Sequence, residues 1–189
     1  HISFFRTNSG ICCIPDPTTP PETLISYANV ARRLAKKMIS HCCIYSDEID
    51  RQEKMQAEIL HSFHPALEHQ EFEIYFQPKV TPCTGAISSA EVLVRWIRNG
   101  QMPGPIYIPL FEQNGFVISL DYYVYGKTFQ WLQKYSDTLP EHFQISLNVS
   151  PLHFEQPQIF IDKIQELLRT YQVDPTHLTF EITESTYVN

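Results

Sequence analysis

Residues 89–96, which read SAEVLVRW, decide the fold of this 189-residue chain. Their branched and aromatic side chains favour a packed, pleated backbone, so the stretch predicts a buried β-strand. Side chains alternate along a strand, which puts Glu91 and Arg95 on one face and Val92 and Trp96 on the other. Four residues at about 3.3 Å each separate the two charged residues by roughly 13 Å along the backbone, too far for a tight ion pair. Glu91 therefore needs a partner from elsewhere, either a cation on a neighbouring strand or a metal ion.

Further strands and helices are expected around this stretch. Strands are predicted at 72–77, 86–96, 143–149 and 178–182, and helices at about 120–135 and 158–171. Only a short turn at 82–85 separates the first two strands, and a parallel pair needs a crossover of a dozen or more residues. These two strands must therefore be antiparallel. The later strands alternate with helices, which is typical of parallel βα units and predicts an α/β fold.

The N-terminal part is expected to contain strands at 2–5 and 10–14 and then a helix. Thr19 is a good N-cap for this helix, and Glu22 completes a capping box with it. All five cysteines of the chain are expected to be small buried hydrophobes, because their odd number and adjacent pairs fit neither a disulfide framework nor a zinc site.

Residues 47–70 are charged and mostly polar, and we expect connecting helices and a domain boundary there. Pro65 should end or kink the first of these helices and cap a short second one. Pro78 should help to end the strand at 72–77, because proline cannot donate a hydrogen bond to a β-ladder.

Composition limits the class of protein. The formal net charge of −7 argues against binding of nucleic-acid polymers or membrane surfaces as the main task. No apolar run approaches the roughly 18 residues of a membrane span, and no signal peptide opens the chain. We therefore expect a cytoplasmic protein without membrane contact in this segment. None of the eight histidines has the spacing of a metal ligand.

Residues 91–96 resemble the signature of the EAL family of cyclic-di-GMP phosphodiesterases, whose members read Glu-Ala-Leu or Glu-Val-Leu and then hydrophobic-Arg-Trp. Similar landmarks follow the family's order and approximate spacing: FEIYFQP at 72–78, IPLFEQNG at 108–115, NVS at 148–150 and EITES at 181–185. The resemblance covers residues 71–189. It implies a modified TIM-type (β/α) barrel with an antiparallel first strand, of which this chain holds about four of eight strands.

The resemblance implies roles for particular polar residues. It makes Glu91, Asn148 and Glu181 metal ligands, Gln77 and Arg95 contacts to the dinucleotide, and Glu91 and Glu184 the catalytic carboxylates, with Glu184 anchoring a loop. The three ligands are hard oxygen donors, which suit Mg²⁺ or Mn²⁺ better than zinc.

Each of these residues also has a simpler interpretation. Asn148 could cap the turn that follows it, and Glu181 could form an ordinary ion pair at a strand end. Gln77, which precedes a proline, could hydrogen-bond a neighbouring backbone group.

Residues 1–46 resemble the C-terminal part of a GGDEF domain, the diguanylate cyclase fold. SGI at 9–11 is similar to that family's late strand, and ANVA at 28–31 to its AD-x-AL helix, with Asn29 where the family has Asp. The resemblance implies an α+β remnant. The catalytic GG(D/E)EF turn would precede His1, so no cyclase activity is assigned. Residues 1–46, 47–70 and 71–189 are thus expected to be a GGDEF-like part, a connection and the N-terminal half of an EAL domain.

The implied function is bacterial second-messenger signalling. The full-length parent should hydrolyse cyclic di-GMP to linear pGpG with metal-activated water, and it could form a homodimer through its EAL domain. The alternative is a non-catalytic cyclic-di-GMP receptor or a protein-interaction signalling module. The family's paired Asp, catalytic Lys and later Glu would follow Asn189, so we expect the 189-residue chain alone to be inactive.

Overall fold

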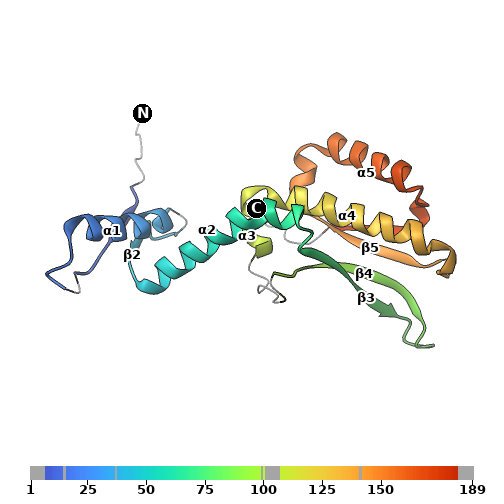
Figure 1. Ribbon diagram of the computed structural model, residues 1–189, viewed down its shortest axis with the longest axis horizontal. Helices are drawn as coiled ribbons and strands as arrows, with labels where there is room; N and C mark the ends of the chain where they lie inside the picture. Colours follow the sequence, from blue (N-terminus) through green and yellow to red (C-terminus); the bar gives the residue numbers. More distant parts are fainter. Residues whose placement is uncertain are drawn as a thin grey trace. The chain divides into compact units, whose positions relative to one another are not determined.

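The protein folds into two units, His1–Ile59 and Leu60–Asn189 (Figure 1). The computed structural model describes residues 7–14, 16–36, 38–98, 100, 107–140 and 142–182. The strand expected at 2–5 therefore lies outside the described residues.

In the first unit, helix α1 (Pro21–Ala35) packs on strands β1 (Ser9–Ile11) and β2 (Cys42–Ile44), which pair in parallel. The contact is close at Gly10, where a Cβ atom would lie only 2.0 Å from the carbonyl oxygen of Ala28. A side chain at this position would push the helix off the strand. The small core of the unit contains Ala31, Ala35 and Cys43.

The capping box predicted for α1 is wrong. Pro20 is the N-cap residue, and no side chain caps the helix. Thr19 belongs to the preceding turn instead, where its backbone N–H donates to the carbonyl of Asp16 at 3.0 Å. The carboxylate of Asp16 also accepts a hydrogen bond from the Thr18 backbone, at 2.8 Å. This side-chain turn uses the local backbone and delays the start of the helix.

The expectation that all five cysteines are buried is also wrong. All five are free, but only Cys43 is buried, while Cys13 and Cys83 are exposed. Cys43 is buried because it lies on β2, a strand that the sequence pattern did not predict, beneath helix α1.

Helix α2 (Asp47–Glu68) is continuous where two helices were predicted, with Pro65 in its last turn. The neighbouring side chains Phe63 and Ala66 are almost fully buried. Their burial compensates for the hydrogen bond that a proline removes from a helix.

The second unit is built on one four-stranded sheet in the order β3-β4-β5-β6. Its strands are β3 (Phe72–Val80), β4 (Ile87–Trp96), β5 (Gln144–Val149) and β6 (Leu178–Ile182). β3 pairs antiparallel with β4, whereas β4 with β5 and β5 with β6 are parallel. The predicted strand directions are therefore confirmed, and the second unit is an α/β fold.

The helices of the second unit are α3 (Tyr107–Asn114), α4 (Phe116–Tyr135) and α5 (Pro157–Tyr171). Helix α4 packs on the sheet, and α5 packs on α4 (Figure 1). Phe76 of β3, for example, meets Trp131 of α4 with ring centroids 4.5 Å apart. Short 3-10 helices lie at Ser136–Thr138, Pro151–Glu155 and Pro175–His177. Within the described ranges, no helix combines the length and hydropathy needed to cross a bilayer.

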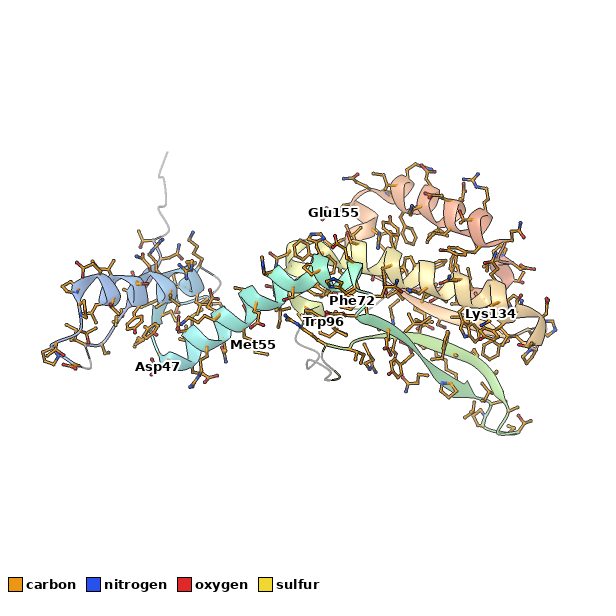
Figure 2. The ribbon with its side chains drawn as sticks, viewed as in Figure 1. Asp47, Met55, Phe72, Trp96, Lys134 and Glu155 are labelled. Atoms are coloured by element: carbon orange, nitrogen blue, oxygen red, sulfur yellow. The ribbon has the colours of Figure 1, made fainter. Side chains whose placement is uncertain are left out.

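An aromatic cluster fills the helix-covered side of β3 and β4. The rings of Phe72 and Trp96 lie 5.2 Å apart on adjacent strands (Figure 2). Phe111 of α3 and Phe63 join them, with ring centroids 4.7 Å apart. Because β-strand side chains alternate, this packing turns Glu91 to the opposite face of the sheet.

The prediction that Pro78 helps to end strand β3 at residue 77 is wrong. Pro78 pairs with Ala90 of β4, and the strand continues to Val80. Proline is tolerated there because β3 is an edge strand among the described strands, so its missing N–H need not serve a second neighbour. The continuation places Lys79 on the same face as Gln77 and Glu91.

We predict that Phe111→Ala destabilises the second unit by about 3–5 kcal/mol, because it removes a fully buried ring from the aromatic cluster. Urea unfolding followed by circular dichroism measures the loss. Phe154→Ala is the matched control, because this residue is 45% exposed and the loss of its ring should cost no more than about 0.5 kcal/mol. Equal losses in the two variants would contradict the assignment of Phe111 to the core.

Candidate functional site

Glu91, Asn148 and Glu181 lie together on the polar face of the sheet. Asn148 is opposite Glu181 in the β5–β6 register, and its Nδ2 donates to Glu91 Oε1 at 2.9 Å. Three strands therefore deliver three oxygen-bearing side chains to one place, as the sequence predicted. Their role as metal ligands stays a prediction.

Lys79 is a fourth member of this cluster, and the sequence pattern did not reveal it. Its Nζ lies 2.7 Å from Glu181 Oε1, 3.2 Å from Ser146 Oγ and 4.0 Å from Glu91 Oε2. The sequence missed Lys79 because the strand was expected to end before it. Period-two alternation from Gln77 was the signal that could have identified it.

The structure supports the simpler interpretations of Glu181 and Glu91 but not that of Asn148. Glu181 does form an ion pair at a strand end, and Glu91 does face a cation from the neighbouring strand, Lys79 in both cases. Asn148 does not cap the next turn with its side chain. Ser150 does so, because its Oγ accepts from the Leu152 backbone at 3.4 Å.

The electrostatics of the cluster are set by Lys79. Its hydrogen bond, followed by one from Ser146, holds the pKa of Glu181 below the usual value for a glutamate. The side chains are half-buried, with 41% of Lys79, 25% of Glu91 and 37% of Glu181 exposed. Two carboxylates and one ammonium give the cluster a formal charge of −1.

The donor set fits a hard divalent cation, because carboxylate and amide oxygens are the ligands that Mg²⁺ and Mn²⁺ prefer. Among the residues that the structure describes, however, no three His, Cys, Asp or Glu side chains gather where they could hold a metal ion. The cluster thus offers two carboxylates and one amide, an incomplete set for a two-metal centre.

Gln77 and Arg95 flank the cluster along the same face. Gln77 is exposed and lies opposite Glu91 in the β3–β4 register. Arg95 is half-buried at the far end of β4, and its Nη1 donates to the neighbouring Val94 carbonyl at 2.9 Å. Glu184 lies outside the described residues.

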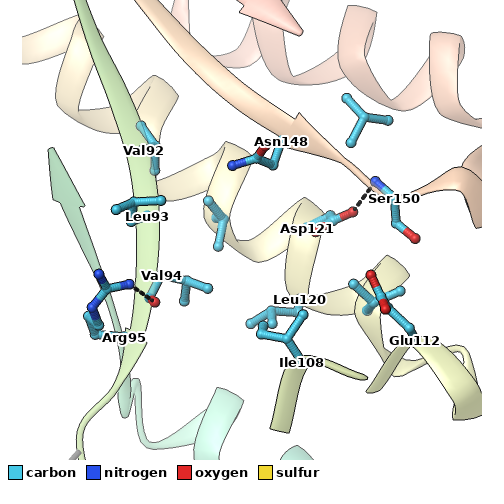
Figure 3. Close-up of a pocket in the computed structure, with 13 residues that line it drawn as sticks. Val92, Leu93, Val94, Arg95, Ile108, Glu112, Leu120, Asp121, Asn148 and Ser150 are labelled. Atoms are coloured by element: carbon cyan, nitrogen blue, oxygen red, sulfur yellow. Dashed lines mark hydrogen bonds between the residues drawn. The ribbon is translucent and has the colours of Figure 1, made fainter. Parts of the chain in front are cut away.

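A cavity of about 310 Å³ opens beside Arg95, between the carboxyl ends of β4 and β5 (Figure 3). It exists because the β4–β5 pairing stops at Glu91 opposite Ser146, so the strands separate beyond this point. Its polar lining consists of Arg95, Glu112, Asp121, Asn148 and Ser150. The remaining lining is apolar and comes from β4, β5, α3 and α4, so the cavity suits a ligand that combines an apolar part with polar groups.

Comparison with known proteins assigns the family. Residues 60–189 match the family model described as the EAL domain, which covers more than half of the chain. The chain belongs to the EAL domain family. The resemblance inferred from residues 91–96 is therefore confirmed.

Two curated relatives match almost the whole chain. An uncharacterised protein of Synechocystis, sll1895, is 27% identical over 96% of this chain and 26% of its own length. The bifunctional diguanylate cyclase/cyclic di-GMP phosphodiesterase MucR of Pseudomonas aeruginosa is 26% identical over 98% of this chain and 27% of its own length. This chain thus spans about a quarter of the length of these relatives.

A solved structure supports the fold. The PaMucR phosphodiesterase in complex with c-di-GMP superposes with a TM-score of 0.62 at 27% identity, over 68% of this chain and 53% of that one.

In this EAL domain, α4 anchors the end of β5 that carries Asn148. The Tyr125 hydroxyl donates to the Asn148 carbonyl at 2.8 Å, and burial raises the pKa of that tyrosine. One turn earlier on α4, Asp121 Oδ2 accepts from the Ser150 backbone at 3.2 Å and lies 3.0 Å from Nε2 of the buried His153. Burial raises the pKa of Asp121, and the hydrogen bond with His153 opposes this shift.

We predict that Asp121→Ala destabilises the second unit by about 2–4 kcal/mol. The change leaves His153 and the Ser150 N–H without their acceptor, and each unsatisfied buried group costs about 1–3 kcal/mol. Asp121→Asn keeps an acceptor oxygen and should cost clearly less. Chemical denaturation of both variants measures the difference, and equal stability of Asp121→Ala and the unmodified protein would disprove the anchoring role.

Proposed function

We propose that this chain is the N-terminal half of an EAL domain whose full-length parent hydrolyses cyclic di-GMP to linear pGpG. The observation that carries the proposal is the cluster of Glu91, Asn148 and Glu181 on adjacent strands of a chain that matches the family. The name of MucR and the ligand of the PaMucR complex support the same substrate.

Each residue has a proposed task. Glu91, Asn148 and Glu181 would hold Mg²⁺ or Mn²⁺ through oxygen atoms. A bound cation of this kind lowers the pKa of its water and neutralises charge that develops on the phosphodiester. Arg95 offers a planar guanidinium, whose paired N–H groups fit a phosphate, in the lining of the cavity. Gln77 would orient the dinucleotide from the other side of Glu91, and Glu184 would support catalysis by anchoring its loop.

The proposal extends to the architecture. The sheet β3–β6 would be the first half of a modified TIM-type barrel, and the first unit would be the end of a GGDEF-like domain. The alignment with MucR, which spans both units, supports this order of domains. The boundaries at 1–46, 47–70 and 71–189 are part of the proposal. Homodimer formation and a cytoplasmic location stay predictions from the resemblance.

Hydrolysis of cyclic di-GMP by the full-length parent, followed by chromatography of pGpG in the presence of Mg²⁺ or Mn²⁺, tests the function. We expect Glu91→Gln to reduce turnover by more than about 100-fold, because loss of even an outer-shell partner of a metal typically costs about 10–100-fold. Glu155→Gln, at an exposed position on a 3-10 helix, is the matched control and should retain full activity. Binding of cyclic di-GMP without turnover by the unmodified parent would support the receptor alternative.

Arg95→Ala in the parent should weaken cyclic-di-GMP binding roughly 10- to 100-fold, since hydrogen bonds to charged groups contribute about 1.5–3 kcal/mol. Its melting temperature should change little, because the hydrogen bond identified for Arg95 is to the adjacent Val94 carbonyl. Isothermal titration calorimetry and thermal melts measure both, with the exposed Arg169→Ala as the charge-matched control. A large loss of stability with unchanged affinity would make Arg95 a structural residue.

A further inference from the structure

Lys79 is the cation that the described cluster already contains. It comes from β3, at the edge of the described sheet, and reaches past β4 to side chains of β5 and β6. Its Nζ lies 2.7 Å from one oxygen of Glu181 and 4.0 Å from one oxygen of Glu91. A single ammonium thus neutralises part of the charge of both carboxylates.

One oxygen of each carboxylate is already engaged in a hydrogen bond. Oε1 of Glu91 accepts from Asn148, and Oε1 of Glu181 accepts from Lys79. A divalent cation bound by both carboxylates would therefore share Glu181 with the ammonium. Like charges that share one carboxylate repel strongly at such short range, because the half-buried site screens them less than bulk water does.

The Lys79 side chain can move out of the cluster into solvent. Its side chain is 41% exposed, so the ammonium can exchange Glu181 for water without unfolding the strand. Its backbone stays fixed meanwhile, because the Lys79 carbonyl accepts from Ser88 Oγ at 3.2 Å and the residue pairs with Ser89.

We propose that Lys79 is an internal counter-cation that competes with the divalent metal for Glu181. In the metal-free protein it holds the two carboxylates together, and metal binding requires the ammonium to release Glu181. Lys79 is thus a positioning residue that sets the affinity of the site for metal. The inference rests on the proposed function, because it assumes that Glu91, Asn148 and Glu181 bind the metal.

The test is Mn²⁺ binding to the full-length parent and to its Lys79→Met variant, measured by isothermal titration calorimetry. Methionine keeps the length of the side chain without its charge, so we expect this variant to bind Mn²⁺ at least tenfold more tightly. Lys79→Arg keeps the charge and should bind as weakly as the unmodified protein. Lys134→Met removes one positive charge from an exposed position on α4 and should leave the affinity unchanged.

Melting in metal-free buffer gives a second readout. Lys79→Met should lower the melting temperature, because two carboxylates then face each other without a cation. The additional change Glu181→Gln should restore it, and Mn²⁺ should restore the single variant. If Lys79→Met is too unstable to purify, Lys79→Gln serves in both measurements.

Two results would overturn the inference, and they differ in meaning. Equal or weaker Mn²⁺ binding by Lys79→Met, with clear binding by the unmodified protein, would show that Lys79 does not compete while the proposed function stands. No Mn²⁺ binding by any variant at millimolar concentration would remove the metal site itself, and with it both the competition and the proposed metal-dependent hydrolysis.

Discussion

The alternation of side chains along β4 is the constraint on which the second unit depends. Val92 and Trp96 point to the helices, where Trp96 joins the ring of Phe72 and both are almost fully buried. The same geometry forces Glu91 and Arg95 to the other face, because a slip by one residue would exchange all side chains between the faces. The aromatic core therefore does more than stabilise the unit. It fixes the register that brings Glu91 opposite Gln77 and Ser146.

The continuation of β3, which lies at the edge of the described sheet, determines the electrostatics of the site. Pro78 has one neighbouring strand in the described sheet, so its missing N–H does not stop the strand from continuing. The continuation carries Lys79 to the carboxylates of Glu91 and Glu181, which come from strands that are distant in sequence. A buried or half-buried carboxylate needs a compensating charge, and here the fold supplies one from its own edge. The site thus holds an internal cation beside oxygen donors of the kind that suits a divalent cation.

Helix α4 connects the core to the site. Its aromatic side chains pack against the sheet. Its Tyr125 and Asp121 also hydrogen-bond to the backbone at the end of β5. The cavity beside Arg95 lies between this anchored end of β5 and the diverging end of β4 (Figure 3). Packing and polar contacts therefore cooperate, since the same helix both closes the core and fixes the backbone that carries Asn148.

The sequence alone determined the features that depend on local pattern. Alternation, turn length and helix spacing were sufficient for the strand directions and the α/β class, and the family resemblance singled out Glu91, Asn148 and Glu181. Tertiary structure decided the features in which burial outweighs local preference. Pro65 lies within a helix because Phe63 and Ala66 are buried beside it, and Pro78 lies within a strand because that strand has only one neighbour among the described strands. The ion pair of Lys79 with Glu181 depends on the continuation of the strand through Pro78. Its two residues are 102 positions apart, and only the pairing of four strands brings them into contact.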